Sequence, residues 1–262
     1  MIPRNFIVEW SAIVSWKQIE QIEQDLIIST ALLKIYQHTH LREKVAFRGG
    51  TALNKLFFSP PSRYSEDIDL VQITSEPIGQ TITMIREIMD PWLGLPKRSA
   101  SKGLVTLTYR MISDTGLKMR LKIEINTREH FAILGYKEQS FSSSSGFFAG
   151  ESTIKTYAIE ELLGTKLRAL YQRRKGRDLY DLHVAIHKIP NLDIDAIIRC
   201  FKEYMDSANQ KVSRVEFHLN IQDKLKDIEF REDIIALLPL EERHFDAEKA
   251  YELIAKEIIG KL

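Results

Sequence analysis

The chain has 262 residues, of which 44% are hydrophobic and 28% are charged, which is typical of a globular protein of one or two domains. It has no apolar run long enough to cross a bilayer, and its first residues lack the pattern of a signal peptide, so we expect no membrane association. The single cysteine, Cys200, excludes an intrachain disulfide and a zinc site built on several thiolates, which favours the cytoplasm. A net charge of +1 excludes the strong overall basicity of a general nucleic-acid binder, although a stretch such as 166–177 is locally basic.

The first half of the chain predicts a helix, two short strands and a turn between them. Helical spacing of apolar residues without Gly or Pro predicts a long helix over 16–39. A buried strand at 45–47 runs into the turn Gly49-Gly50-Thr51 and a helix at 52–57, which ends before two prolines. A loop then leads to a second strand at 67–71.

The rest of the chain predicts a helix, a hairpin and a helical C-terminal part. After a helix at 78–90, strict alternation predicts strands at 105–111 and 117–125 that are joined by a turn. The serine-rich stretch 140–151 reads as a mobile loop with a domain boundary, and four further helices are expected, over 158–174, 177–188, 194–206 and 245–260. We therefore expect an α+β fold, with a core domain at 1–150 that has a small mixed sheet and a helical domain at 151–262 that contributes Lys166 and Asp178 to the site.

Two aspartates on the second strand are candidate metal ligands. Residues two apart in a strand point to the same face, so Asp67 and Asp69 project together while Ile68 and Leu70 face the core. Two neighbouring carboxylates repel each other unless a cation lies between them, and such oxygen ligands suit Mg²⁺ or Mn²⁺. The alternative is a polar strand face beside solvent, because this two-residue pattern is common.

The turn that follows the first strand is a candidate phosphate-binding segment. Glycines allow close approach of a phosphate to the backbone, and the start of the next helix offers free N–H groups, so Gly49, Gly50 and Thr51 could hold a nucleotide. A plain tight turn is the alternative for two glycines alone. Arg63 and Ser65, on the loop before the aspartates, could touch phosphate or merely shape that loop.

Three further residues could complete a site. Glu124 lies on the polar face of the hairpin and would form a third carboxylate if its strand pairs with the strand of Asp67 and Asp69; the alternative is a surface glutamate. Lys166 lies at the edge of an apolar helix stripe, where it should be paired, contact a triphosphate, or extend its ammonium to solvent. Asp178 could orient Lys166 or an arginine, or could cap its helix.

Four motifs in order resemble the AbiEii/AbiGii (MenT-like) toxins, which are nucleotidyltransferases with a DNA polymerase β-type core. The motifs lie within 47–182 and read FRGGTALNKLF, RYSEDIDL, KIEI and ELLGTKLRALYQRRKGRDLYDL. The resemblance implies that Gly49, Gly50 and Thr51 hold the incoming nucleotide, and that Asp67 and Asp69 bind the metals. It further implies that Lys166 contacts the triphosphate and that Asp178 is the later essential aspartate. The third acidic position is often Asp in such proteins, whereas here it is Glu124.

The resemblance also implies partners and a reaction. Family members act as toxins of type IV-like toxin–antitoxin pairs, and some add nucleotides to the 3′ end of tRNA, so NTP, an RNA acceptor and a cognate antitoxin are expected partners. Other acceptors, such as a protein side chain or a small molecule, remain open, as does a non-catalytic nucleotide- or RNA-binding protein with the same fold. A hydrolase is disfavoured because the sequence offers no dedicated nucleophile.

Overall fold

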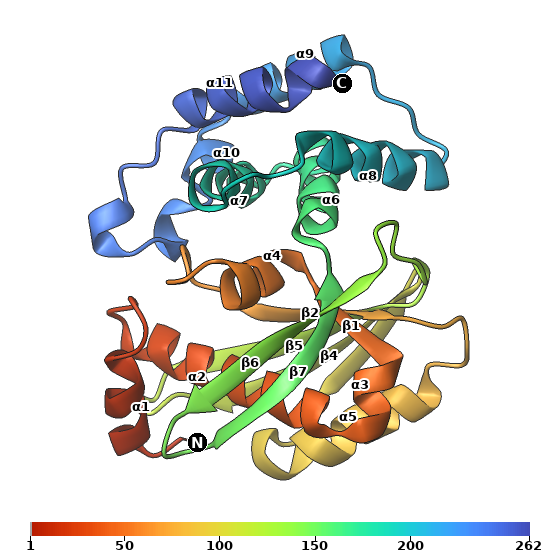
Figure 1. Ribbon diagram of the computed structural model, residues 1–262. Helices are drawn as coiled ribbons and strands as arrows, with labels where there is room; N and C mark the ends of the chain where they lie inside the picture. The colour runs from red at the N-terminus through yellow and green to blue at the C-terminus, as the bar shows by residue number, and fades with distance from the viewer. Residues whose placement is uncertain (1) are drawn as a thin grey trace. The chain divides into compact units, whose positions relative to one another are not determined.

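The computed structural model describes residues 2–262, which form two compact units, 2–157 and 158–262. Unit 1 is a mixed sheet with helices, and unit 2 is helical, which confirms the expected fold class (Figure 1). The units separate between residues 157 and 158, seven residues after the boundary expected at 150/151. No helix among the described residues has both the length and the apolarity needed to cross a membrane.

Unit 1 contains a seven-stranded sheet in the order β3-β4-β5-β2-β1-β7-β6. β2 runs parallel to β5 and β1 runs parallel to β7, while every other neighbouring pair is antiparallel. The strands are β1 Val45–Arg48, β2 Asp67–Gln72, β3 Lys97–Ser101, β4 Leu104–Ile112, β5 Lys118–Asn126, β6 Tyr136–Ser144 and β7 Ala149–Tyr157.

The helices of unit 1 bury one face of this sheet. Along β5, Leu121, Ile123 and Ile125 are fully buried and alternate with half-buried polar residues, as the hairpin pattern predicts. α2 packs against β5, β6 and β7, and α5 packs against β4. The helices are α1 Arg4–Ser11, α2 Ile19–Gln37, α3 Thr39–Lys44, α4 Gly49–Ala52, the π-helix η1 Leu53–Phe57 and α5 Gly79–Leu93.

A buried carboxylate in α2 anchors the segment that follows the glycine turn. Asp25 accepts hydrogen bonds from the indole N–H groups of Trp10 (2.9 Å) and Trp16 (3.1 Å), and it pairs with the Lys55 ammonium at 2.7 Å. Because Lys55 lies in η1, this ion pair fixes η1 on α2. A buried ion pair of this kind is stable only when its remaining hydrogen-bonding atoms are satisfied. Here the two indole N–H groups satisfy the Asp25 carboxylate.

The loop expected over 140–151 is wrong, because β6 and β7 form a hairpin there. β6 carries few apolar side chains, so alternation gives no signal, and the backbone pairing of Ser144 with Ala149 and of Ser140 with Thr153 holds the strand. β3 was also missed because it is a short edge strand whose residues are all exposed.

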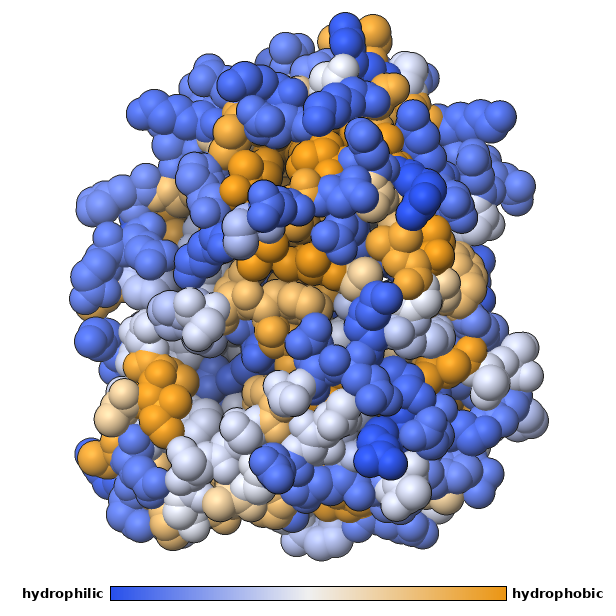
Figure 2. Space-filling view, viewed as in Figure 1, coloured by the Kyte–Doolittle hydropathy of each residue, from blue (hydrophilic) through white to orange (hydrophobic). Residues whose placement is uncertain are grey.

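Unit 2 consists of helices, and Figure 2 shows hydrophilic residues over much of the visible surface of each unit. Four of its helices match the predicted ranges, whereas α9 and α10 were not anticipated. α9 begins with a capping box between Ser213 and Glu216 and buries few residues, so its apolar periodicity is weak. The helices are α6 Ile159–Gln172, α7 Gly176–Lys188, α8 Ile194–Ser207, α9 Arg214–Leu225, α10 Ile228–Glu232 and α11 Ala247–Glu257, with the 3₁₀ turns η2 Ile235–Leu237, η3 Leu240–Glu242 and η4 Ile259–Lys261.

Candidate active site

The register of β2 and β5 brings three carboxylates to one face of the sheet. Asp69 lies directly opposite Glu124, and Asp67 lies opposite Lys122. Paired residues in adjacent strands share a face, so Asp67, Asp69 and Glu124 all project away from the buried side. The strand pairing on which the Glu124 expectation depended is therefore present.

The carboxylate of Asp67 is placed where a negative charge is unfavourable. Burial raises the pKa of Asp67 to about 6; the charge of Lys122 opposes this rise, and those of Asp69, Glu66 and Glu124 add to it. A divalent cation bound between the carboxylates would remove this penalty, because an opposite charge favours the ionised form.

Gly49 lies against the second aspartate. Its φ is +82°, and a Cβ placed on it would lie 2.1 Å from Asp69 Oδ2. Only glycine allows both that backbone conformation and that close approach. The turn therefore meets the carboxylate face directly, and the two motifs identified in the sequence are neighbours in space.

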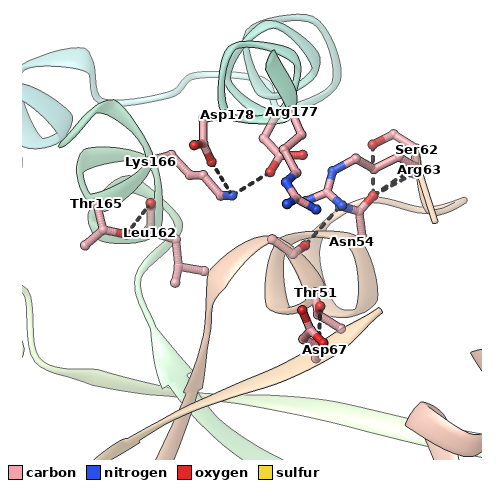
Figure 3. Close-up of polar contacts among 12 residues, drawn as sticks. Thr51, Asn54, Ser62, Arg63, Asp67, Leu162, Thr165, Lys166, Arg177 and Asp178 are labelled. Atoms are coloured by element: carbon pink, nitrogen blue, oxygen red, sulfur yellow. Dashed lines mark hydrogen bonds and ion pairs between the residues drawn. The ribbon is translucent and has the colours of Figure 1, made fainter. Parts of the chain in front are cut away.

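Thr51 links the turn to the start of β2. Its hydroxyl donates a hydrogen bond to the backbone carbonyl of Asp67 at 2.6 Å (Figure 3). The side chain is buried, and it does not cap α4, whose N-cap residue is Arg48 without a side-chain cap. Thr51 thus sets the position of the strand that carries the aspartates.

Asn54 holds the loop that precedes β2, and the sequence reasoning missed it. Its amide oxygen accepts hydrogen bonds from the backbone N–H groups of Ser62 (2.9 Å) and Arg63 (3.1 Å), and its amide nitrogen donates to the Gly50 carbonyl at 3.0 Å (Figure 3). One residue therefore ties the glycine turn to the loop. Asn54 lies four residues after Gly50 in a predicted helix, and this spacing could have indicated their contact.

The two loop candidates, Arg63 and Ser65, are both buried. Arg63 Nη1 donates to the Tyr64 carbonyl at 3.0 Å. The hydroxyl of Ser65 has no hydrogen-bond partner among residues 2–262. Buried polar atoms are nearly always paired in native proteins, so this hydroxyl marks a place where a bound group could supply the missing hydrogen bond.

The donor set fits a divalent cation held jointly with a substrate. Within the part of the chain that the structure describes, no group of three or more His, Cys, Asp or Glu side chains is arranged so that it could hold a metal ion. Mg²⁺ is commonly bound through one or two carboxylates together with substrate phosphates and water. Asp67 and Asp69, on adjacent positions of one strand face, supply such a pair.

Lys166, Asp178 and Asp181 form a buried ion cluster within unit 2. The Lys166 ammonium lies 2.9 Å from Asp178 Oδ1 and 2.9 Å from Asp181 Oδ2, and only 6% of Lys166 is exposed (Figure 3). Arg173 donates from Nε and Nη2 to the two oxygens of Asp178, at 2.7 and 2.9 Å. Lys166 therefore does not extend to solvent, and it links α6 to α7 through two carboxylates.

The electrostatics of Asp178 follow from this cluster. Burial of Asp178 favours its neutral form, but the Lys166 ammonium and the Arg173 guanidinium outweigh that effect and hold the pKa of this carboxyl well below its usual range. Asp178 is therefore ionised in the folded unit, where it orients both cations. A role for Asp178 or Lys166 in binding a triphosphate stays a prediction.

Comparisons with known proteins identify the family and the fold of the chain. A family model described as the nucleotidyl transferase AbiEii toxin of type IV toxin–antitoxin systems matches residues 31–255. The fold is similar to that of MenT4, a nucleotidyltransferase toxin from Mycobacterium tuberculosis H37Rv, with 15% identity, a TM-score of 0.61, and coverage of 97% of this chain and 99% of that chain. It is also similar to JHP933 from Helicobacter pylori, with 15% identity, a TM-score of 0.54, and coverage of 94% and 96%. No curated protein sequence matches the chain.

Proposed function

Because the chain belongs to the AbiEii family of nucleotidyl transferase toxins from type IV toxin–antitoxin systems, we propose that it transfers NMP from an NTP to an acceptor hydroxyl, with RNA, most simply the 3′ end of tRNA, as the acceptor. The observation that carries the proposal is the contact between the glycine turn and the carboxylate face, where a Cβ on Gly49 would lie 2.1 Å from Asp69 Oδ2. This closeness brings a phosphate-binding segment to a cation-binding pair.

In this proposal Asp67 and Asp69 hold Mg²⁺ or Mn²⁺, and Glu124 is the third carboxylate. When bound, the cation stabilises the charge that develops on the attacking and leaving oxygens. The backbone at Gly49, Gly50 and Thr51 positions the NTP phosphates. Glu124, which pairs in register with Asp69, accepts the proton of the attacking acceptor hydroxyl in this proposal.

The remaining candidates have supporting parts in the proposal. Ser65 offers its unpartnered buried hydroxyl to the nucleotide, and Arg63 holds the loop that presents Ser65. Lys166 neutralises charge on the triphosphate, and Asp178 orients Lys166 through their 2.9 Å contact. A cognate antitoxin and a cytoplasmic location follow from the family as further proposals.

The test is nucleotide transfer by full-length Asp67→Asn and Asp69→Asn variants. Either change removes a carboxylate while keeping its shape, so labelling of total tRNA by radiolabelled NTP and Mg²⁺ should fall by roughly a thousandfold. Circular dichroism should show that both variants stay folded. Wild-type labelling rates in either variant would reject the metal role of that residue.

Other acceptors are separated by the same assay. Protein or small-molecule acceptors would be labelled in a lysate while purified tRNA is not, which would keep the chemistry and change the acceptor. A protein that binds NTP by calorimetry but labels nothing would instead be a non-catalytic nucleotide-binding member of the fold.

A further inference from the structure

The polar face of the β4–β5 hairpin carries a row of cations that ends at the aspartates. Lys118, Arg120 and Lys122 alternate along β5 and are followed on the same face by Glu124. Successive members lie about 7 Å apart, because a strand rises about 3.4 Å per residue. Arg110 of β4 lies directly opposite Arg120. We call Arg110, Lys118, Arg120 and Lys122 the basic strip.

The Arg110–Arg120 pair is unfavourable as it stands. Directly opposed residues have Cβ atoms about 5 Å apart, and like charges at that position destabilise a sheet. Neither guanidinium forms an ion pair with a carboxylate of residues 2–262, and both side chains are exposed. An anion lying over the two strands would turn this repulsion into attraction.

Several other cations of unit 1 are paired with acids, unlike Arg110 and Arg120 of the basic strip. Arg48 pairs with Glu129 at 2.6 Å, Lys44 pairs with Glu76 at 2.9 Å, and Lys155 pairs with Glu43 at 2.8 Å. In the basic strip only Lys122, opposite Asp67, has an acidic neighbour in register.

A cavity of about 800 Å³ within unit 1 is shared by residues of the strip and by Asp67, one of the two proposed metal ligands. Arg110, Lys118 and Arg120 line it, and so does Asp67. Glu20 and Glu66 also line the cavity, so its three cations face three carboxylates. The cavity thus brings Asp67 beside cations of the strip, and a phosphate bound there has to be held by the arginines and Lys118.

The strand order separates this surface from the nucleotide side. β2 lies between β1, which leads into the Gly49 turn, and β5, which carries Glu124 and the strip. If the triphosphate lies at the turn, the acceptor must approach Asp67 and Asp69 from the β5 side, where Glu124 can take its proton. The strip lies on that side.

We propose that the basic strip binds the backbone phosphates of the RNA acceptor and guides its 3′ end to the carboxylates. This inference rests on the proposed nucleotidyl transfer. RNA fits better than an acidic protein because its phosphates recur with every nucleotide, as the cations recur with every second residue along β5. Arg110 and Arg120 clamp the strand, and Lys122 lies nearest to Asp67.

The test uses the full-length Arg110→Gln/Arg120→Gln double variant and a fluorescein-labelled single-stranded RNA, with anisotropy measured at several salt concentrations. Binding should weaken roughly tenfold, because two charge-assisted contacts are lost. The slope of log K against log salt should fall by about 1.4, since each lost phosphate contact on a single strand contributes about 0.7. Arg98→Gln/Lys137→Gln, which removes two exposed charges elsewhere in unit 1, should change neither value.

Kinetics separate this inference from the proposed function. In the double variant, KM for the RNA acceptor should rise while KM for NTP stays as in the wild type. RNA affinity, salt slope and acceptor KM that match the wild type would overturn the strip's role even if nucleotide transfer is intact. Arginine-dependent RNA binding without transfer to any RNA would instead keep the strip and reject the proposed reaction. Binding of an acidic protein with no RNA affinity would overturn the choice of RNA.

Discussion

Gly49 is restricted in two ways, by its backbone conformation and by its closeness to the carboxylate face of the sheet. Its positive φ can be adopted by other residues at a cost, but a side chain there would collide with the Asp69 carboxylate. The colliding group is the Asp69 carboxylate, so the collision can be relieved only by moving that carboxylate. Position 49 therefore excludes other residues more strongly than an ordinary turn position does. A side chain there would displace Asp69, which is proposed to bind the metal.

In Gly49→Ala, the rate of nucleotide transfer should fall by at least tenfold, because Asp69 is displaced. The free energy of unfolding should also fall by about 1 kcal/mol, because alanine is strained at a positive φ. Transfer rate and thermal unfolding are measured together. Gly135→Ala is the matched control, because Gly135 also has a positive φ of 71° but nothing within 4 Å of a Cβ. The control should lose similar stability and keep its activity; equal activity in both variants would contradict the argument.

At this scale the sequence predicts side chains that share a strand face, and it misses those that meet across strands. Asp67 and Asp69 lie two positions apart, so alternation alone aligns them. Lys122 lies opposite Asp67 only because β2 pairs with β5 in one register, and that register depends on long-range pairing. Asn54 was missed for a related reason, since its partners lie on a loop whose path the sequence does not define.

At the scale of elements, α6 and α7 are joined by charges rather than by apolar contacts alone. Lys166 contributes the cation, and Asp178 and Asp181 lie one turn apart on α7, so both oxygens reach one ammonium. The sequence places Lys166 at the edge of an apolar stripe, where a partner is one of three possibilities, and it offers Asp178 as a residue that could orient Lys166. It does not indicate that Asp181 shares the ammonium, because two separate helices supply the groups.

Lys166→Ala should lower the free energy of unfolding by about 3–5 kcal/mol, because it leaves buried carboxylates without their cation. Arg173 still pairs with Asp178, so the loss should lie toward the lower end. Chemical denaturation measures it. Lys202→Ala on the exposed side of α8 should shift stability by less than about 0.5 kcal/mol. A wild-type unfolding curve for Lys166→Ala would show that the cluster does not stabilise unit 2.

The errors among strands share one physical origin. The missed strand β3 is exposed along its length and β6 has few buried apolar side chains, so neither shows the alternation that marks a strand in the sequence. Strong alternation, as in β4 and β5, was predicted correctly because one face is buried.

At the scale of the whole molecule, the fold class and the order of motifs were predictable, and the family match over residues 31–255 agrees with them. The chain pairs a sheet that carries carboxylates with a helical unit that carries a buried cation cluster. The acceptor was not predictable, because its recognition depends on exposed side chains such as Arg110 and Arg120, which no core constraint fixes.

The most direct measurement compares NTP labelled at the α-phosphate with NTP labelled at the γ-phosphate. Each is incubated with the protein, Mg²⁺ and total tRNA, with Asp69→Asn as the inactive control. The account predicts that the α label enters RNA and that the γ label is released as pyrophosphate, with neither seen for the control. Transfer of the γ label to the acceptor, or no α label in any acceptor, would contradict nucleotide transfer as the function of this protein.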